Sequence, residues 1–500
     1  MTDDFASDGA EPVTDYREVA ADSRAAARAT LAILASRVVV AALGWAGSVV
    51  IARSLSSEEW GQFSFVFALL GVMSIVTDLG VGRVVLADLI GADRDEIART
   101  ASSFLALRTV LGIVGYVCAL GYVMLLRYPG EVVVATAVAG VVVILATPSH
   151  ALTVLYQSRH RMLGVAVAES LGQVLQLALT VAAALFAPML LLFILPVVAN
   201  EAFKLIVKGL GITRPSVGIH PARQVGVHRW KPMLVEAIPL AIGFALTVAT
   251  MKIDILMLSL LDTYDAVGLY SIGYKFSDII DTFALAAAAP ISTLLVAAWP
   301  AEPTVFRDRT RMAAVLFGLG GAVCVVAFWP SAEPLIRLLY GDRFAPSASA
   351  ARLLVVGAAL TALIILGIFL LTAAGKQRSY PWVAITGLAV NVGLNLVLIP
   401  RMSYDGAAIS TVATWAVSVT LLWIVIARVM PIDGLLPLSR LAGLTVITVI
   451  LCAAGSFTVD AVPGLWPVVS VAGVVLLVGA AYASRLLDGL PLPRGRRRTP

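Results

Sequence analysis

Long apolar segments follow one another along most of the 500-residue chain, with only short polar stretches between them. A helix needs about 20 predominantly apolar residues to cross the hydrocarbon core of a bilayer. Segments of this length and composition lie near 30–52, 61–83, 102–126, 130–153, 163–186, 189–210, 233–261, 266–298, 310–339, 349–374, 379–400, 405–429, 437–458 and 462–485. The pattern predicts an all-α multi-pass membrane protein with about 14 transmembrane helices.

The composition fits a protein surrounded mainly by lipid. Charged residues make up 13% of the chain, whereas soluble proteins carry about 25%. The positive-inside rule tests the segments. With both ends placed in the cytoplasm, 28 of the 36 Lys and Arg lie inside, two within the membrane and six outside. The outside residues are Arg53, Arg127, Arg337, Arg343, Arg352 and Arg401. This asymmetry predicts an even number of spans, cytoplasmic termini and a location in the cell membrane.

The two chain ends and the cysteines indicate no further chemistry. The N-terminus begins MTDDFASDGAEP, which lacks the basic region of a cleaved signal peptide, so we expect it to stay in the cytoplasm. The tail RGRRR at 494–498 suggests nucleic-acid binding, but basic clusters beside a span more often contact headgroups and fix topology. Cys118, Cys324 and Cys452 lie singly in apolar runs, without metal-ligand or disulfide spacing. We therefore expect no nucleic acid, no metal and no cofactor.

Two pairs of segments indicate an internal repeat. SLSSEEWGQFSF (54–65) and LLDTYDAVGLYSI (260–272) share an acidic turn followed by Gly, an aromatic residue and Ser, at an offset of 207 residues. A second match aligns 155–177 with 373–396 and pairs Gln176 with Asn395. Repeated halves are common in transporters. We predict two parallel six-helix bundles around a central cavity, plus a C-terminal helix pair.

The predicted domains follow from this repeat. They are a cytoplasmic N-terminal segment (1–29), an N-terminal six-helix bundle (30–210), a basic cytoplasmic linker (211–232), a C-terminal six-helix bundle (233–430), an extra helix pair (431–486) and a basic cytoplasmic tail (487–500).

Charged residues interrupt the seventh and eighth apolar segments. Each costs roughly 2.5–3.5 kcal/mol at the bilayer centre on insertion scales. The two segments form a hairpin, so Lys252 and Lys275 both lie roughly 13–14 Å from its outer turn, at about 1.5 Å per residue. Asp254 lies slightly above that level and Asp278 slightly below it, and we expect both to balance the lysines.

The eighth segment carries a polar stripe at helical spacing, which consists of Ser271, Tyr274, Lys275, Asp278, Asp281 and Thr282. One interpretation is that Lys and Asp only pair to hold helices together. A stripe with added hydroxyls exceeds what such a lock needs, and polar stripes at this depth usually line a wet cavity. We favour the cavity, with Lys252, Lys275, Ser271 and Tyr274 toward substrate and Asp281 among the charge-balancing or coupling groups.

Two further charges lie in the first half of the chain. Arg37 sits about two turns inside the first segment and is either a substrate-binding residue or an arginine that extends to the cytoplasm. Glu169 lies with Gln173 and Gln176 along one side of the fifth segment, and we expect it to be a coupling or charge-balancing residue.

Several motifs resemble one known family. IARSLSSEEWGQFSFVFALLGVMSIVTDLGVGR (51–83) is similar to the opening signature of the polysaccharide flippases, the Wzx-like branch of the multidrug/oligosaccharidyl-lipid/polysaccharide (MOP) exporter superfamily. LIRLLYGDRFAPSASAARLL (335–354), NVGLNLVLIP (391–400) and DGAAISTVAT (405–414) resemble the same family in the same order. The resemblance covers about 30 to 430.

This resemblance implies a fold and a function. The family has twelve to fourteen helices in two bundles around a central, often cationic cavity. Its members export undecaprenyl-pyrophosphate-linked glycans by alternating access, with ion coupling in several of them. Ser36-Arg37-Val38 also resembles a first-helix motif of lipid II flippases, in which the arginine is functional. Those flippases carry an Arg-Asp pair further along the helix, where this chain has Leu43 and Gly44, so the resemblance does not extend to lipid II as substrate.

We therefore expect a monomeric transporter, not an enzyme, that flips a polyprenyl-pyrophosphate-linked oligosaccharide for cell-surface polysaccharide export. The expected partners are that substrate, the bilayer and, among proteins, a glycan polymerase or glycosyltransferases. Two alternatives remain open. A multidrug cation exporter of the same superfamily would need a dominantly acidic cavity. A membrane glycosyltransferase or polymerase would need a catalytic domain or long external loop, and the four histidines are scattered at predicted cytoplasmic ends.

Overall fold

The regular elements of this computed structural model, which describes residues 16–215, 217–296, 298–430, 432, 434–484 and 486, are all helices. Four short 3₁₀ turns join some of the α-helices. The α-helices are α1 (Tyr16–Ser54), α2 (Ser57–Asp78), α3 (Val81–Leu89), α4 (Arg94–Leu125), α5 (Gly130–Ser158), α6 (Met162–Phe186), α7 (Leu190–Ile212), α8 (Trp230–Leu261), α9 (Tyr264–Val296), α10 (Pro303–Phe328), α11 (Ala332–Tyr340), α12 (Ala348–Ala373), α13 (Tyr380–Val429), α14 (Leu438–Ala461) and α15 (Trp466–Ala483).

The all-α membrane architecture predicted from the sequence is confirmed. Ten helices of the described chain are long and apolar enough to cross a bilayer. One of the ten, α13, contains non-helical backbone at Ser403 (φ 54°, ψ −137°), so it consists of two helices that match the predicted segments 379–400 and 405–429. The exact count of fourteen spans remains a prediction.

The second predicted segment is broken near its end. A capping box starts α2, because the Ser56 side chain accepts from the Glu59 amide while the Glu59 carboxylate accepts from the Ser56 amide. The helix stops at Asp78, since Leu79 (φ 46°) and Gly80 (φ 68°) adopt left-handed backbone. Buried Arg108 of α4 donates to the Thr77 and Asp78 carbonyls at 2.6 and 3.0 Å and to the Asp78 carboxylate at 2.8 Å, so it satisfies the open helix end.

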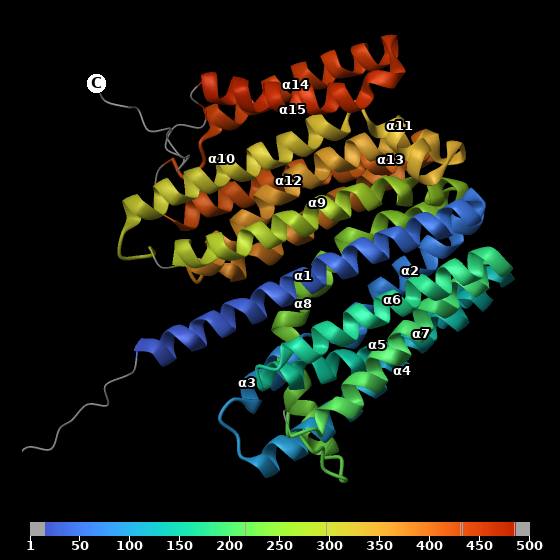
Figure 1. Cartoon of the computed structure of the whole chain (residues 1–500), viewed down its shortest axis with the longest axis vertical. Helices are drawn as coiled ribbons and strands as arrows, with labels where there is room; N and C mark the ends of the chain where they lie inside the picture. The colour runs from blue at the N-terminus through green and yellow to red at the C-terminus, as the bar shows by residue number, and fades with distance from the viewer. Residues whose placement is uncertain are drawn as a thin grey trace, which may run out of the picture.

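The helices form two groups that lie close together at one end and diverge toward the other (Figure 1). Where α2 and α9 begin, one continuous apolar core contains Trp60 and Phe65 of the first group and Tyr270 and Tyr340 of the second. At the opposite end each group has a core of its own. We call α1–α7 the N bundle, α8–α13 the C bundle, and these two ends of the molecule the joined end and the separate end.

Helices α2 and α9 cross at the joined end through the repeated motif. A Cβ atom on Gly61 would lie 1.8 Å from the Tyr264 carbonyl oxygen, and one on Gly268 would lie 2.3 Å from that of Ser57. The Ser64 hydroxyl donates to the Ser271 hydroxyl at 3.0 Å. Residues 57 and 264, 61 and 268, and 64 and 271 each differ by the 207-residue repeat offset, so the contact is close to two-fold symmetric. Only glycine permits this approach of the two backbones.

Arginines also connect the bundles at the joined end. Arg53 of α1 donates to the Leu338 and Leu339 carbonyls of α11 at 2.5 and 2.7 Å. In the opposite direction, Arg343 of the C bundle donates to the Leu55 carbonyl at 2.5 Å. Each arginine therefore satisfies carbonyls at a helix end that belongs to the other bundle.

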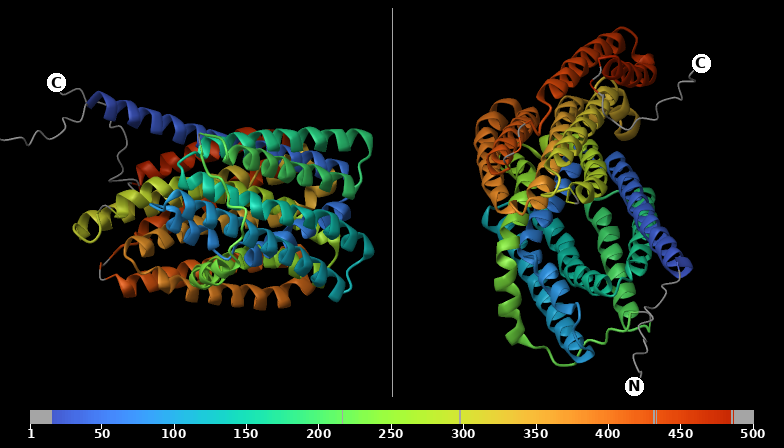
Figure 2. Two further views of the ribbon diagram at one scale, coloured as in Figure 1. Left: turned by 90° about the horizontal axis from the view of Figure 1, so that it is seen from below. Right: turned by 90° about the vertical axis from the view of Figure 1, so that its left-hand side faces the viewer.

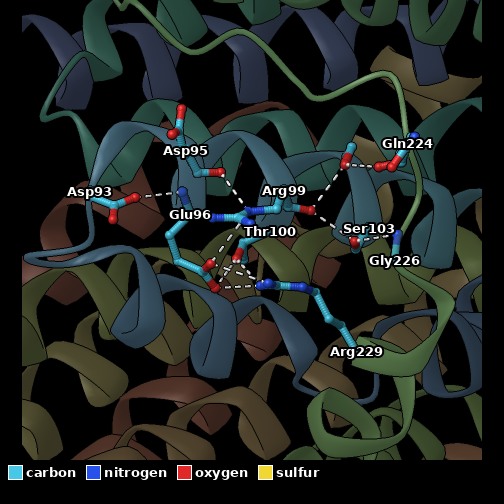
Figure 3. Close-up of polar contacts among 10 residues, drawn as sticks. Asp93, Asp95, Glu96, Arg99, Thr100, Ser103, Gln224, Gly226 and Arg229 are labelled. Atoms are coloured by element: carbon cyan, nitrogen blue, oxygen red, sulfur yellow. Dashed lines mark hydrogen bonds and ion pairs between the residues drawn. The ribbon is translucent and has the colours of Figure 1, made fainter.

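The linker between the bundles is fastened to the N bundle (Figure 3). Arg229 pairs with both carboxylate oxygens of Glu96, and this hydrogen bonding raises the pKa of its guanidinium group. The Gly226 amide donates to the Ser103 hydroxyl at 3.0 Å, and the Trp230 indole donates to the Ser103 carbonyl at 3.0 Å. The first turns of α8 continue this attachment, since Met233 and Ala237 belong to the N-bundle core.

The last two helices lie outside the repeat. Figures 1 and 2 show α14 and α15 side by side at the rim of the C bundle, where both pack on α10. They add no residue to the contacts between α2 and α9 described above, although Cys452 and Leu477 belong to the large apolar core.

The crossing predicts a glycine-specific effect. Gly61→Ala should force α2 and α9 apart, because overpacking costs about 1–3 kcal/mol and outweighs the gain in helix propensity of about 1 kcal/mol. We expect a lower thermal unfolding midpoint in detergent and faster maleimide labelling of a Ser64→Cys probe in a cysteine-free background. Gly121→Ala is the matched control, since a Cβ there has nothing within 4 Å. Equal behaviour of the two variants would contradict the proposed contact.

Candidate functional site

The charged stripe lies on the C bundle, where α8 and α9 pack together. Lys252 of α8 places its Nζ 4.8 Å from the centre of the Tyr274 ring of α9, a cation–π contact. The Tyr274 hydroxyl donates to the Met251 carbonyl at 3.0 Å and so fixes the ring below the lysine. Tyr274 therefore supports Lys252, and its hydroxyl is already engaged.

Lys252 also reaches the N bundle. A Cβ atom on Gly71 of α2 would lie 3.9 Å from Lys252 Cγ and 4.0 Å from Cε. The lysine stem thus packs across the boundary between the bundles, against a helix position that has no side chain. Lys252 is partly accessible to solvent.

Lys275, Asp278 and Asp281 continue the stripe along α9 toward the separate end. All three lie deep among the helices, yet each keeps part of its surface accessible to solvent. Lys275 and Asp278 interact electrostatically with each other and with Lys252, and Asp281 interacts with Asp278. Within the described chain, neither lysine makes an ion pair closer than the 4.0 Å limit. Charges that lie close together, are partly exposed and are not in ion pairs remain available to a ligand.

Asp254 lies in a separate buried network inside the C bundle. One carboxylate oxygen accepts from Asn395 Nδ2 at 2.6 Å, and the other accepts from the Tyr270 hydroxyl at 2.9 Å and the Thr411 hydroxyl at 2.8 Å. Asn395 donates in addition to Asn391 Oδ1 at 3.0 Å, while its own side-chain oxygen is buried without a recorded partner. None of the hydrogen bonds recorded for Asp254 comes from a lysine, so its carboxylate is held by neutral donors.

The remaining predicted residues lie elsewhere. Ser271 is buried at the joined end, where it contacts Ser64. Arg37 is exposed on α1, next to Ser36, whose hydroxyl lies 2.8 Å from that of Ser170 on α6. Glu169 lies in the N bundle and pairs with Lys208 at 3.2 Å.

Sequence reasoning missed two sets of partners. Tyr270, Thr411 and the two asparagines around Asp254 come from α9 and α13, which are distant in sequence, and the aspartate was expected beside the lysines instead. Lys208 was counted with the basic cytoplasmic residues, although only 2% of its surface is exposed. The four-residue spacing of Asn200, Lys204 and Lys208 was the available signal for a polar helix face.

The fold resembles solved transporters. MurJ, a lipid II flippase in an inward closed conformation, aligns over 92% of this chain and 99% of its own, at TM-score 0.71 and 11% identity. An inward-facing multidrug resistance MATE family transporter of the MOP superfamily aligns over 79% and 95%, at TM-score 0.67 and 15% identity. An outward-facing structure of such a transporter aligns over 82% and 95%, at TM-score 0.55 and 14% identity. No curated protein sequence matches the chain.

A family assignment follows from the sequence itself. The family described as polysaccharide biosynthesis protein matches residues 26–293, just over half of the 500 residues. The match includes the motif at 51–83 and the α8–α9 hairpin that carries the charged stripe. The family and the structural neighbours are of the flippase and exporter type, in keeping with the ten apolar helices and a multi-pass membrane protein. The chain belongs to the polysaccharide biosynthesis protein family.

Proposed function

We propose that this protein flips a polyprenyl-pyrophosphate-linked oligosaccharide across the cytoplasmic membrane, for export of a cell-surface polysaccharide. The observation that carries the proposal is the pair of partly exposed lysines on the α8–α9 hairpin, Lys252 and Lys275, of which Lys252 packs against α2 of the N bundle. A cation at this depth is costly, so it persists where it serves an anionic substrate.

The chemistry of the substrate fits this stripe. A pyrophosphate presents anionic oxygens, for which Lys and Arg are the natural donors. The sugar presents hydroxyl groups, which can donate hydrogen bonds to the carboxylates of Asp278 and Asp281. The polyprenyl tail stays in lipid while the headgroup crosses between the bundles. Exposed Arg37 on α1 is a further cation that we propose for the headgroup. A multidrug cation exporter would not place two lysines at this level.

Alternating access supplies the mechanism that we propose. The positive-inside rule assigns most of the basic residues to the cytoplasm, and α1, which ends at Arg53 in the joined end, begins at the separate end, so we place that end in the cytoplasm. The molecule then faces inward, with the joined end closed toward the outside. Opening outward requires the α2–α9 crossing and the Arg53 and Arg343 contacts to separate.

We propose Asp254 as the residue that couples transport to a cation gradient. Its carboxylate is 2% exposed, and four further side-chain oxygens lie in its network, those of Asn391, Asn395, Thr411 and Tyr270. Oxygen atoms are the ligands of hard cations, and a carboxylate also binds a proton. Asp278 and Asp281 are the proposed charge-balancing groups of the stripe.

The proposed substrate implies which enzymes act before and after this transporter. A lipid-linked oligosaccharide must be built by glycosyltransferases and consumed by a polymerase or ligase that acts on the same lipid. We propose that this monomeric transporter works between those enzymes in the cell membrane.

Locking the joined end should stop transport. The paired substitution Ser64→Cys and Ser271→Cys, in a background without Cys118, Cys324 and Cys452, places two thiols where the hydroxyls are 3.0 Å apart. Oxidation should abolish glycan export, and reduction should restore it. The matched control is Ser36→Cys with Ser170→Cys, whose hydroxyls are 2.8 Å apart but within one bundle. Export that persists in the fully cross-linked α2–α9 pair would refute alternating access at this interface.

Removal of the central lysine should separate binding from folding. Lys275→Ala should abolish glycan export and leave abundance nearly intact, because a partly wet residue contributes little packing. Lys275→Arg should restore part of the export, since the charge survives in a different geometry. If Lys275 only locks helices, Lys275→Ala strands a carboxylate and lowers abundance, and adding Asp278→Ala restores both abundance and export. Restored export in that double variant would overturn the substrate-binding role.

Asp254→Asn should remove ion coupling. The amide keeps the shape of the side chain but can neither bind a proton nor supply negative charge. In wild type, a bound cation should raise the thermal midpoint. At a cation concentration of one hundred times its Kd, binding adds about 2.7 kcal/mol to the free energy of unfolding. We expect Asp254→Asn to lose the shift with Na⁺ or with lower pH, whichever wild type shows. Asp405→Asn, an acid-to-amide change at an outer turn, is the control, and an unchanged shift in Asp254→Asn would exclude the site.

A further inference from the structure

The N bundle contains ion pairs in which the cation is buried and the carboxylate is accessible to solvent. Arg108 donates to Asp78 Oδ1 at 2.8 Å, and the exposed fractions of the two side chains are 3% and 41%. Lys208 Nζ lies 3.2 Å from Glu169 Oε1, with exposed fractions of 1% and 40%. Among the described residues, no hydrogen bond is recorded to Asp78 Oδ2 or Glu169 Oε2. Each buried cation therefore holds a carboxylate through one oxygen and leaves the other oxygen able to accept.

These ion pairs gather around one histidine of α5. His150 is exposed to solvent, yet it interacts electrostatically with Arg108 of α4 and Lys208 of α7. It also interacts with Lys204 and Glu201 of α7, which form a third ion pair at 2.5 Å. A side chain that is exposed within electrostatic reach of charged groups on two other helices lies beside solvent inside the bundle. The ion pairs therefore belong to one solvent-accessible polar region.

Helix α2 connects this region with the boundary between the bundles. Asp78 follows Gly71 by seven residues, which complete almost two helical turns, so the two positions lie on the same face of α2. Gly71 is the position against which the Lys252 stem packs. At about 1.5 Å per residue, Asp78 lies about 10 Å beyond Gly71 toward the separate end. The charged stripe of α9 continues in the same direction on the opposite wall.

The accessible surface of the region determines which ligand it suits. Its three ion pairs are neutral as pairs, but Arg108 and Lys208 are buried while their carboxylate partners are exposed. A free carboxylate oxygen accepts hydrogen bonds from hydroxyl groups, and the charge strengthens those bonds. A further anion would be repelled by the same oxygens. The region therefore fits an uncharged group with several hydroxyls, and not a phosphate.

We propose that Asp78, Glu169 and His150 form a sugar subsite for the lipid-linked substrate, and that this subsite selects an uncharged sugar. The two carboxylates accept hydrogen bonds from sugar hydroxyls, and the imidazole supplies a further polar contact. The arrangement follows the order of groups in the substrate, with the pyrophosphate at the lysines and the glycan nearer the end that we place in the cytoplasm. This inference rests on the proposed function, because it assigns the glycan part of the same substrate.

The test compares the binding of three lipids to the purified full-length protein in nanodiscs. The lipids are undecaprenyl pyrophosphate, the same lipid carrying a neutral disaccharide, and the same lipid carrying a disaccharide that ends in a uronic acid. Wild type should bind the neutral glycolipid about tenfold more tightly than the sugar-free lipid, as expected for a hydrogen bond to a charged acceptor. The uronic acid should remove this gain.

Amide variants identify the groups that recognise the sugar. Asp78→Asn and Glu169→Gln keep an oxygen for the buried cation and replace the free acceptor by an NH₂ donor. Each should reduce the preference for the neutral glycolipid and leave the Kd of the sugar-free lipid unchanged. Glu131→Gln, an acid-to-amide change at the exposed opposite end of α5, is the matched control and should bind all three lipids like wild type. His150→Ala, at an exposed position, tests the subsite without altering an ion pair.

Two results would overturn the subsite. One is equal binding of the three lipids by wild type. The other is a wild-type preference for the neutral glycolipid in His150→Ala and in every amide variant that folds, which would leave the ion pairs a structural role only. Lys275→Ala separates this inference from the proposed function, since it should weaken all three lipids alike. If wild type binds no pyrophosphate lipid at all, the proposed function is rejected and the subsite falls with it.

Discussion

A charge inside a membrane protein must be paired, hydrogen-bonded or wetted, and this requirement explains how the polar residues of the chain are arranged. Lys208 is paired and sealed, since Glu169 and Thr153 surround its ammonium group. Asp254 is hydrogen-bonded and buried, since three neutral side-chain donors take the place of water around its carboxylate. Lys275 is partly exposed and interacts with Asp278 without forming an ion pair within 4.0 Å. The three solutions differ in what they leave free, and only the third leaves a cation able to meet a new anion without first losing a partner.

The contact between the bundles has to be specific and yet breakable under the proposed mechanism. The α2–α9 crossing supplies the specificity, because Gly61 and Gly268 bring the two backbones close. The Arg53 and Arg343 contacts end on main-chain carbonyls, and each such hydrogen bond contributes about 1 kcal/mol net, or somewhat more when the donor is charged. A handful of these bonds can hold one state and still be exchanged for water when a ligand favours the other.

The sequence predicted the architecture better than the partnerships. Apolar length predicted the helices, and the Gly61/Gly268 match predicted a repeat whose two copies turn out to touch each other. Depth along a helix can be read from residue counting, so the levels of Lys252 and Lys275 were accessible. Direction was not. Asp254 lies two residues from Lys252, and that spacing on a helix turns the two side chains about 200° apart. The aspartate therefore points into the C bundle, whereas the lysine lies against α2.

The repeat itself shows where the two halves have diverged. At the 207-residue offset, Lys252, Lys275 and Asp278 of the C bundle correspond to Trp45, Ala68 and Gly71 of the N bundle. The same backbone scaffold thus presents charge on one side of the boundary and an apolar or empty position on the other. Gly71 is the clearest case, because the side chain missing there is the space against which the Lys252 stem packs. Had both copies kept the charges, Lys252 would meet a carboxylate at position 71, and an ion pair across the closed interface would occupy the lysine. A one-sided stripe lets the bundles close on an apolar partner, while the charges stay directed toward water and whatever anion enters it.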